Sequence, residues 1–411
     1  MLAARFTRMR RTLVTSALLA LLVPLLAEVP APSGAVVAAP GSSATAPAAP
    51  AAPAAPAARA KVPALRVSTR VQGLNHPWDA VQLPSGSLLL TERDPARLTL
   101  ARPGGGKQTV GFPSDRIWTS GETGLMGLEV DPGFASNRRI YTCSGWIKRP
   151  GQHDIRVNAW RLAPGGGRVT LINTLVAGLP TTSGRHGGCR LLVTRGGALV
   201  VGTGDAAVGS NPRDKRSLGG KTLRVNRFTG AAWPSNPFIR SENAATRKLL
   251  TYGHRNVQGL AQRSDGTLWS VEHGSYRDDE VNRLVAGGDY GWNPVPGYDE
   301  SVPMTDFSLP GKQYGARWRS GDPTVATSGA TFVYGKRWGA LNGALAVAVL
   351  KDERLLFMRF GARGFNPRVS APAALRGRYG RLRTAVQVNG GLLVLTDGDG
   401  GTGRALLVRP Q

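Results

Sequence analysis

The sequence predicts an all-β fold, a β-propeller, from a strand pattern that recurs five times along the chain. In each copy a turn glycine is followed two residues later by leucine, then by apolar residues and finally by a polar side chain. The copies are SGSLLLTE (85–92), GGALVVGTGD (196–205), DGTLWSVEHG (265–274), NGALAVAVLKD (342–352) and GGLLVLTD (390–397). Because the leucine and the polar residue stand at even offsets from the glycine, they lie on one face of a strand. Repeated strand units with irregular insertions are typical of propellers, whose four-stranded sheets surround a central channel.

The composition favours many short strands over long helices. Of the 411 residues, 54 are glycine and 29 are proline, and 41% are hydrophobic, which is typical of a turn-rich globular protein. No helical periodicity of twelve or more residues stands out after residue 61, whereas 155–163 and 330–335 are further strand candidates. Two packed sandwich domains are the alternative all-β arrangement. No linker-like composition interrupts the middle of the chain, so we expect one domain over residues 62–411.

Two N-terminal segments are expected to lie outside this domain. Residues 1–39 carry four arginines followed by an apolar run over 13–26. That run is short for a membrane span, so it predicts a signal peptide, with an uncleaved membrane anchor as the alternative. Residues 40–61 are almost entirely alanine and proline, which predicts a semi-extended linker. We therefore expect an exported protein that is secreted, periplasmic or attached to the membrane or cell envelope through its N-terminus.

The charge is strongly basic, and the excess belongs to the predicted domain. The formal net charge is +26, and residues 1–61 contribute only six basic residues and one acidic residue to it. Nucleic-acid binding is one explanation, but no Lys/Arg run exceeds two residues and no nucleic-acid-binding motif is visible. We therefore expect no nucleic-acid partner, and a solvated basic surface that is attracted to an anionic cell envelope.

The chain has two cysteines, Cys143 and Cys189. In an oxidising compartment they could pair, and Cys189 lies only three residues after His186. The alternative is two separate buried thiols that pack as small hydrophobic side chains.

Three neighbouring segments predict a site that holds an anionic cofactor together with a hard cation. They are GHRNVQG (253–259), EHGSYRDDEVN (272–282) and DYGWNP (289–294). Arg255 offers a planar fork of donors that suits carboxylate and quinone oxygens, and Asn256 adds a neutral donor. Upstream, GRHGGCR (184–190) presents His186 between glycines, where it could take a proton from a hydroxyl, although an ordinary hydrogen-bonded histidine is the alternative.

In order and spacing, these segments resemble the glucose/sorbosone dehydrogenase family, over roughly residues 65 to 409. The resemblance implies a propeller of about six blades that oxidises sugars with pyrroloquinoline quinone (PQQ) and calcium. It implies that His186 is the base, that Asp205 supports it, and that Arg255 faces the quinone. A carboxylate in that place orients the imidazole ring and stabilises its protonated form.

The same resemblance implies the remaining ligands. Residues that match cofactor-binding positions are Arg255, Asn256, Lys351, Arg381 and Arg383. Several cations suit a cofactor with three carboxylates, although each of these residues could instead be an ordinary surface cation. The main-chain carbonyls of Gly274 and Ser275 match the ligands of the active-site Ca²⁺. Glu280 and Tyr290 match a second, structural calcium site, to which a solvated acidic loop is the alternative.

One position departs from the family pattern. GETGLMGLEVDPGFASNRRIY (121–141) resembles a family segment in which a glutamine that helps to bind the cofactor stands where this chain has Glu122. An ionised glutamate beside a polycarboxylate repels it unless the glutamate is protonated or paired with arginine.

The expected function is therefore that of an exported PQQ- and calcium-dependent dehydrogenase. It would oxidise the anomeric carbon of aldose sugars to lactones and pass electrons to an external acceptor. Glu122 favours one alternative, a non-catalytic propeller that binds a glycan or a protein partner. A calcium-dependent lactonase is a further alternative, but it needs carboxylates and asparagine around a channel metal, whereas the matched positions are mostly arginine and lysine.

Overall fold

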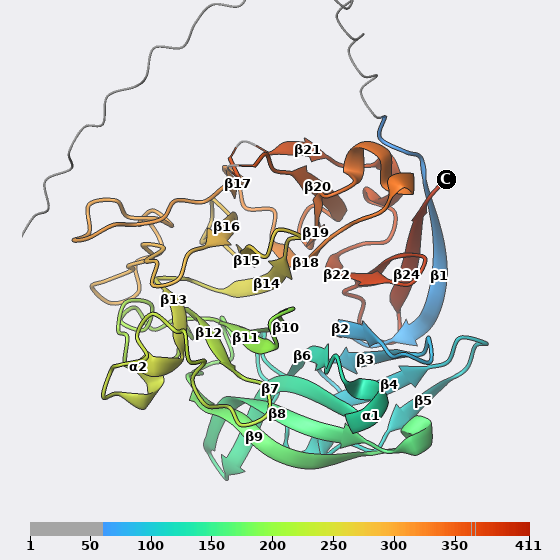
Figure 1. Ribbon diagram of the computed structural model, residues 1–411, viewed down its shortest axis with the longest axis horizontal. Helices are drawn as coiled ribbons and strands as arrows, with labels where there is room; N and C mark the ends of the chain where they lie inside the picture. The colour runs from blue at the N-terminus through green and yellow to red at the C-terminus, as the bar shows by residue number, and fades with distance from the viewer. Residues whose placement is uncertain (1–60, 363, 366) are drawn as a thin grey trace, which may run out of the picture. The chain divides into compact units, whose positions relative to one another are not determined.

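The computed structural model describes residues 61–411 with the exception of 363 and 366, and these residues form six four-stranded antiparallel sheets. The sheets are arranged in a ring, which confirms the predicted six-bladed propeller (Figure 1). The predicted signal peptide or anchor, and all of the predicted linker but its last residue, lie outside the described residues. Within the described part of the chain, no helix has the length and apolar character needed to cross a membrane.

In the first five blades the chain runs from the innermost strand, at the channel, to the outermost. Blade 1 contains β2 (Pro77–Gln82), β3 (Leu88–Glu92), β4 (Arg97–Ala101) and β5 (Lys107–Val110). Blade 2 contains β6 (Leu125–Val130), β7 (Arg139–Arg149), β8 (Gln152–Leu162) and β9 (Val169–Leu179). Blade 3 contains β10 (Gly188–Val193), β11 (Ala198–Thr203), β12 (Lys221–Asn226) and β13 (Leu249–Tyr252).

The remaining blades follow the same order until the last one, whose outermost strand comes from the start of the domain. Blade 4 contains β14 (Val257–Gln262), β15 (Leu268–Glu272), β16 (Glu280–Leu284) and β17 (Trp318–Arg319). Blade 5 contains β18 (Thr327–Phe332), β19 (Leu345–Val349), β20 (Arg354–Arg359) and β21 (Arg368–Ser370). Blade 6 contains β22 (Leu382–Val388), β23 (Gly391–Thr396), β24 (Gly403–Pro410) and β1 (Leu65–Leu74).

Strand β1 closes the ring. The first strand in sequence pairs with β24, the last, in a register that runs from Leu65 opposite Pro410 to Leu74 opposite Gly403. This closure joins the two ends of the domain in one blade, because β24 pairs with β1 on one side and with β23 on the other.

Helices are short, as the sequence predicts. The α-helices are α1 (Phe134–Asn137) and α2 (Ala244–Lys248), and the 3₁₀ helices are η1 (Ser114–Arg116), η2 (Pro164–Gly166), η3 (Lys336–Leu341) and η4 (Ala373–Leu375). Asn243 caps α2, because its side-chain oxygen accepts the main-chain N–H groups of Ala245 and Thr246.

The repeated sequence pattern marks the second strand of five blades: β3, β11, β15, β19 and β23. The predicted strands at 155–163 and 330–335 correspond to β8 and β18. Apolar side chains of successive blades pack against one another between the sheets. One such layer includes Val157 and Ala159 of blade 2 with Leu199 and Val201 of blade 3, all fully buried. The core is therefore a set of layers between blades rather than one central mass.

Cys143 and Cys189 form a disulfide, which settles the alternative between pairing and separate thiols. Their Cα atoms are 5.4 Å apart, and the bond joins β7 of blade 2 to β10 of blade 3. The two blades are in main-chain contact beside the bond, because a Cβ atom at Gly127 would lie 2.1 Å from the carbonyl oxygen of Cys189. Only glycine leaves room for that main-chain contact.

Candidate functional site

A cavity of about 470 Å³ lies at one end of the channel, where the innermost strands of blades 1, 4, 5 and 6 begin. We call it the cationic cavity. It is lined by His76, Trp78, Arg93, Glu122, Gln258, His273, Ala326, Leu350, Arg381, Arg383, Asp397 and Asp399. Residues of five blades and their loops thus converge on one pocket, although the first and the last of them, His76 and Asp399, are more than 300 positions apart in sequence.

Three of the predicted cofactor-binding residues, Glu122, Arg381 and Arg383, line this cavity. Two more predicted site residues adjoin it through Glu122. Its Oε2 atom accepts the Asn256 side-chain N–H at 3.2 Å and the His186 main-chain N–H at 3.1 Å. The structure therefore brings together residues from segments that begin at 121, 184 and 253.

Two other predicted residues border the cavity. Lys351 directly follows Leu350, which lines the cavity, and its side chain is exposed. Ser275 lies two positions after the lining residue His273, and its hydroxyl oxygen is buried without a hydrogen-bond partner among the described residues. The N–H of Gly274 donates to Asp279 Oδ1 at 2.9 Å, which fixes the turn that carries both carbonyls.

His186 and Asp205 form the predicted pair. His186 Nδ1 lies 2.8 Å from Asp205 Oδ1, and His186 is only 3% exposed. The other carboxylate oxygen accepts the Trp292 indole N–H and the Tyr298 hydroxyl, each at 2.8 Å. With its proton on Nδ1 toward the carboxylate, the imidazole keeps Nε2 unprotonated. That nitrogen makes no hydrogen bond within the described part of the chain, so it can accept a proton from a ligand.

The backbone at His186 is held in an unusual conformation. His186 has a φ of 52°, in the left-handed region that non-glycine residues seldom occupy. The carbonyl oxygen of His186 lies so close to Gly204 that a Cβ atom on residue 204 would be 1.8 Å from it. Glycine at the end of the VGTGD segment is therefore needed to seat His186 beside Asp205.

Arg255 is buried beside this pair. Its main-chain N–H donates to Glu272 Oε2 at 3.0 Å, and its guanidinium pairs with Glu300, on the long loop between β16 and β17. The guanidinium carbon lies 5.7 Å from the ring centroid of Trp292, and Nε is buried without a partner among the described residues. Arg255 therefore retains donor capacity toward the site.

Charges in the cavity set the ionisation of its acidic groups. Burial raises the pKa of Asp397, but Arg383, which donates at 2.9 Å, and Arg381 outweigh burial and lower that pKa to about 2. Burial also raises the pKa of Glu122, yet His186, which donates its main-chain N–H to the carboxylate, and Arg255 bring it below the ordinary value. Glu122 is therefore ionised at neutral pH, and hydrogen bonds from His186 and Asn256 hold its carboxylate.

His273 provides a neutral polar group in the same cavity. Burial, together with Arg383 and Arg255, lowers the pKa of its imidazole to about 3. Its Nε2 atom is buried and has no hydrogen-bond partner among the described residues.

The second predicted calcium site is built differently from the first. Glu280 is buried opposite Glu272 in the β15–β16 ladder, and burial raises its pKa to about 8. Its Oε1 atom accepts the Thr305 hydroxyl at 3.2 Å and lies 3.4 Å from Arg319 Nε. The Tyr290 hydroxyl donates to the Arg283 carbonyl at 2.6 Å. No cluster of three His, Cys, Asp or Glu side chains that could hold a metal ion occurs within residues 61–411, where described.

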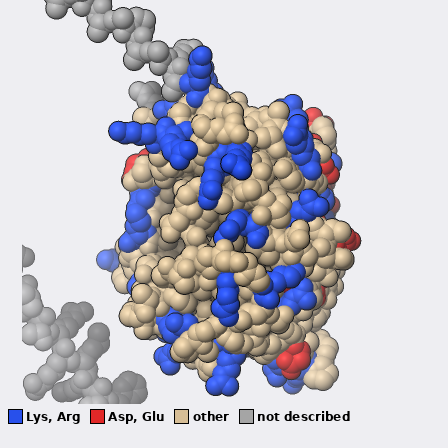
Figure 2. Space-filling model, turned by 90° about the vertical axis from the view of Figure 1, so that its right-hand side faces the viewer, with Lys and Arg blue, Asp and Glu red and all other residues tan. Residues whose placement is uncertain are grey.

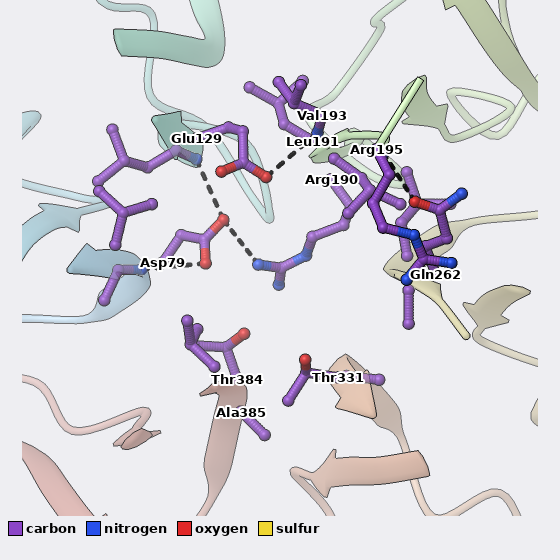
Figure 3. Close-up of a pocket in the computed structure, with 18 residues that line it drawn as sticks. Asp79, Glu129, Arg190, Leu191, Val193, Arg195, Gln262, Thr331, Thr384 and Ala385 are labelled. Carbon is purple, nitrogen blue, oxygen red and sulfur yellow. Dashed lines mark hydrogen bonds and ion pairs between the residues drawn. The ribbon is translucent and has the colours of Figure 1, made fainter. Parts of the chain in front are cut away.

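A second cavity, of about 280 Å³, lies further along the channel and is lined by the innermost strands of all six blades (Figure 3). In the lining of this second cavity, Arg190 Nη1 pairs with Asp79 Oδ2 at 2.8 Å (Figure 3). The Arg190 guanidinium also lies 4.1 Å from the ring centroid of Trp78, which lines the cationic cavity. The ion pair therefore lines the second cavity and reaches the cationic cavity through Trp78.

Several site residues were not predicted. They are His76, Arg93, His273, Trp292, Tyr298, Glu300, Asp397 and Asp399. His273 and Trp292 stand inside EHGSYRDDEVN and DYGWNP, and Asp397 ends one of the repeats, so a signal was present. Tyr298 and Glu300 lie on a loop with no pattern that could have identified them.

The cationic cavity fits an anionic, polar ligand. Polar atoms buried in or beside it without partners among the described residues are Arg255 Nε, Gln258 Oε1, His273 Nε2 and Ser275 Oγ. Buried polar groups are nearly always hydrogen-bonded, so a cluster of unpaired ones indicates a missing partner. Arg381 and Arg383 add donors that suit carboxylates.

Comparisons with known proteins agree on one family. The family model described as Glucose / Sorbosone dehydrogenase matches residues 74–408. Aldose sugar dehydrogenase YliI of Escherichia coli is 29% identical over 297 residues, which are 69% of this chain and 78% of that protein. Quinoprotein glucose dehydrogenase B of Acinetobacter calcoaceticus is 29% identical over 257 residues, and the match spans about half of each protein, 56% and 52%.

Solved structures show the same architecture. The PQQ-bound aldose sugar dehydrogenase of Streptomyces coelicolor superposes with a TM-score of 0.70 at 28% identity, covering 86% of this chain and 100% of that one. The apo-form of the soluble aldose sugar dehydrogenase of Escherichia coli gives 0.73 at 27% identity, covering 84% and 100%.

Proposed function

The chain belongs to the glucose/sorbosone dehydrogenase family, and from that premise we propose that it is an exported PQQ- and calcium-dependent dehydrogenase of aldose sugars. It oxidises the anomeric carbon to a lactone and passes electrons to an external acceptor. One observation carries this proposal: a cavity with unpaired, buried polar atoms and two arginines adjoins the His186–Asp205 pair.

The cofactor is held by cations and amides at the cavity. Arg381 and Arg383 line the cavity, Lys351 stands at its border, and Arg255 and Asn256 approach it from the side of Glu122. PQQ, when bound, supplies the quinone that accepts the hydride and its two electrons. Arg255 contributes a buried positive charge next to the place where negative charge develops during the transfer.

Calcium completes the site through main-chain oxygens. The carbonyls of Gly274 and Ser275 are hard, neutral ligands of the kind that Ca²⁺ accepts, and the Gly274 turn is fixed by Asp279. A second calcium ion at Glu280 and Tyr290 has a structural role. There the Tyr290 hydroxyl donates to the Arg283 carbonyl and accepts the Val285 N–H, so the main-chain carbonyl of Tyr290 is the oxygen left to contribute.

The acid–base step belongs to His186. Nε2 accepts the proton of the anomeric hydroxyl, while Asp205 keeps the imidazole oriented and stabilises its positive charge. Trp292 and Tyr298 hold the far oxygen of Asp205 at 2.8 Å, so the carboxylate cannot turn away from the ring. The base is thus assembled before the sugar arrives.

Export is supported by two features of the chain. The basic and apolar N-terminal pattern is typical of a signal peptide or anchor. The Cys143–Cys189 disulfide suits an oxidising compartment.

The proposal is tested by reconstituting the purified protein with PQQ and Ca²⁺ and scanning aldoses with an artificial electron acceptor. We expect turnover that requires PQQ and is lost when a chelator removes calcium. Tight PQQ binding without turnover of any aldose would favour the non-catalytic propeller that binds a glycan or protein. Hydrolysis of lactones with calcium alone would favour the lactonase.

A further inference from the structure

The two ends of the propeller can be told apart by strand direction. Strand β18 begins next to Ala326, which lines the cationic cavity, and runs past Thr331, which lines the second cavity. Helix η3 follows β18 and therefore lies at the second-cavity end. Strand β1 leads toward His76 of the cationic cavity, so its first residues also lie at the second-cavity end.

Six exposed cations gather at this second-cavity end, and we call them the basic face. They are Lys61, Arg66, Lys336, Arg337, Arg359 and Arg409. Arg66 and Arg409 stand directly opposite each other in the β1–β24 ladder. The carbonyl of Lys61 accepts the N–H of Ala340 at 3.0 Å, and Arg359 reaches the carbonyl of Ala340 at 3.5 Å.

None of these six side chains forms an ion pair within the described part of the chain. At the other end, the two arginines closest to the proposed site do form ion pairs, Arg255 with Glu300 and Arg383 with Asp397. Like charges opposite each other in a ladder destabilise the sheet, so folding does not account for the Arg66–Arg409 arrangement. Figure 2 shows the side of the propeller where β1 and β24 lie, with lysine and arginine spread over it and few acidic atoms among them.

The sequence before Lys61 indicates what the basic face binds. Residues 1–60, which contain the apolar run over 13–26, join the domain at Lys61, which is part of the basic face. Clusters of lysine and arginine beside a membrane-directed segment are attracted to anionic lipid headgroups. We propose that the basic face docks on an anionic phospholipid surface and that the cationic cavity opens away from it.

This orientation leaves the cationic cavity accessible to soluble sugar. The electrostatic attraction of the basic face to the lipid surface adds to any membrane binding by the N-terminal segment. It does not require that segment. It is also independent of the chemistry at His186, because the basic face and the site are at opposite ends of the channel.

The experiment uses a chain that begins at residue 61, since all six blades and their closure lie within residues 65–410. Co-sedimentation compares vesicles of phosphatidylcholine alone with vesicles that also contain phosphatidylglycerol. In the face variant the six cations of the basic face are replaced by glutamine. In the control variant six other exposed, unpaired cations are replaced by glutamine: Lys148, Arg149, Arg216, Lys312, Arg376 and Arg378.

Both variants lose the same charge, so only the position of the charge differs. We expect the wild-type chain to bind the anionic vesicles, the face variant to bind at least about thirtyfold more weakly, and the control to change less than about threefold. Equal weakening of both variants would overturn the docking face in favour of diffuse attraction, and so would absence of wild-type binding. Preferential, face-dependent binding to double-stranded DNA over the vesicles would replace the lipid surface by nucleic acid. Circular dichroism confirms that each variant is folded.

Discussion

Nδ1 of His186 lies 2.8 Å from Oδ1 of Asp205, and both side chains are almost completely buried. Trp292 and Tyr298 donate hydrogen bonds to the other oxygen of the carboxylate, Oδ2. These bonds hold Oδ1 of Asp205 toward the imidazole ring. This arrangement leaves Nε2 as the ring nitrogen that can accept a proton from a substrate.

Replacing His186 by glutamine should lower kcat by about a hundredfold or more, because the proton of the hydroxyl loses its acceptor. PQQ should still bind, since the substitution removes none of the cations and amides that are proposed to hold the cofactor. Steady-state kinetics and a PQQ titration measure the two effects. Asp205→Asn is the companion variant, and it should also reduce kcat because an amide does not stabilise the charged imidazole. Unchanged turnover in His186→Gln would exclude His186 as the base.

Replacing Glu122 by glutamine should strengthen PQQ binding. The carboxylate is ionised, since its pKa lies below the ordinary value, and it repels a cofactor carboxylate. Glutamine retains an oxygen that can accept the N–H groups of Asn256 and His186. Titration of PQQ at neutral pH compares the two proteins, with Glu122→Asp as a control that keeps the charge. Weaker binding in the glutamine variant would show that the charge of Glu122 helps to organise the pocket.

The fold was largely predictable because a period of two in hydrophobicity is a local property. The Gly-x-Leu pattern identified the second strand of five blades. The pattern did not identify the second strand of blade 2, β7. This strand begins at Arg139, just after α1, and has no turn glycine directly before it.

The site was only partly predictable. His186, Asp205, Arg255 and Asn256 stand in short motifs, and the structure does bring them together. Glu300, by contrast, reaches Arg255 from a loop 45 residues further along the chain. That contact depends on how the insertion between β16 and β17 folds back, which no local pattern describes.

Removing the disulfide should destabilise the propeller without exposing a new surface. The bond closes a loop with a sequence separation of 46, so replacing both cysteines by serine should lower the free energy of unfolding by about 4 kcal/mol. Denaturant unfolding of the double variant measures it. The wild-type protein under reducing conditions should move toward the same value, if the reductant reaches the buried bond. A double variant as stable as the wild type would show that the contact at Gly127 alone holds the two blades.

Stability should fall as pH rises because of Glu280. Its pKa is raised to about 8 in the folded protein, so the folded state holds this proton more tightly than the unfolded state does. The contribution is fully present below the unfolded pKa near 4.5 and is lost as pH rises to 8, by up to about 1.4 kcal/mol per pH unit. Glu280→Gln should flatten this slope in denaturant unfolding measured across that range.

Calcium gives a further readout of the same carboxyl. If Glu280 is a ligand of a structural Ca²⁺, calcium should raise the melting temperature of the wild type more at pH 8 than at pH 5, because binding needs the ionised carboxylate. The Glu280→Gln variant should lose this difference. Identical calcium responses in both proteins would remove Glu280 from the second site.

Oxidation of an aldose by this protein with PQQ is tested most directly by a single-turnover experiment without an electron acceptor. The protein loaded with PQQ and Ca²⁺ is mixed rapidly with an aldose, and the absorbance of the bound quinone is followed. We predict that the quinone is reduced at a rate that saturates with sugar, that one lactone forms per site, and that His186→Gln slows this step by about a hundredfold. A loaded protein whose quinone stays oxidised at saturating concentrations of every aldose would contradict the proposed function.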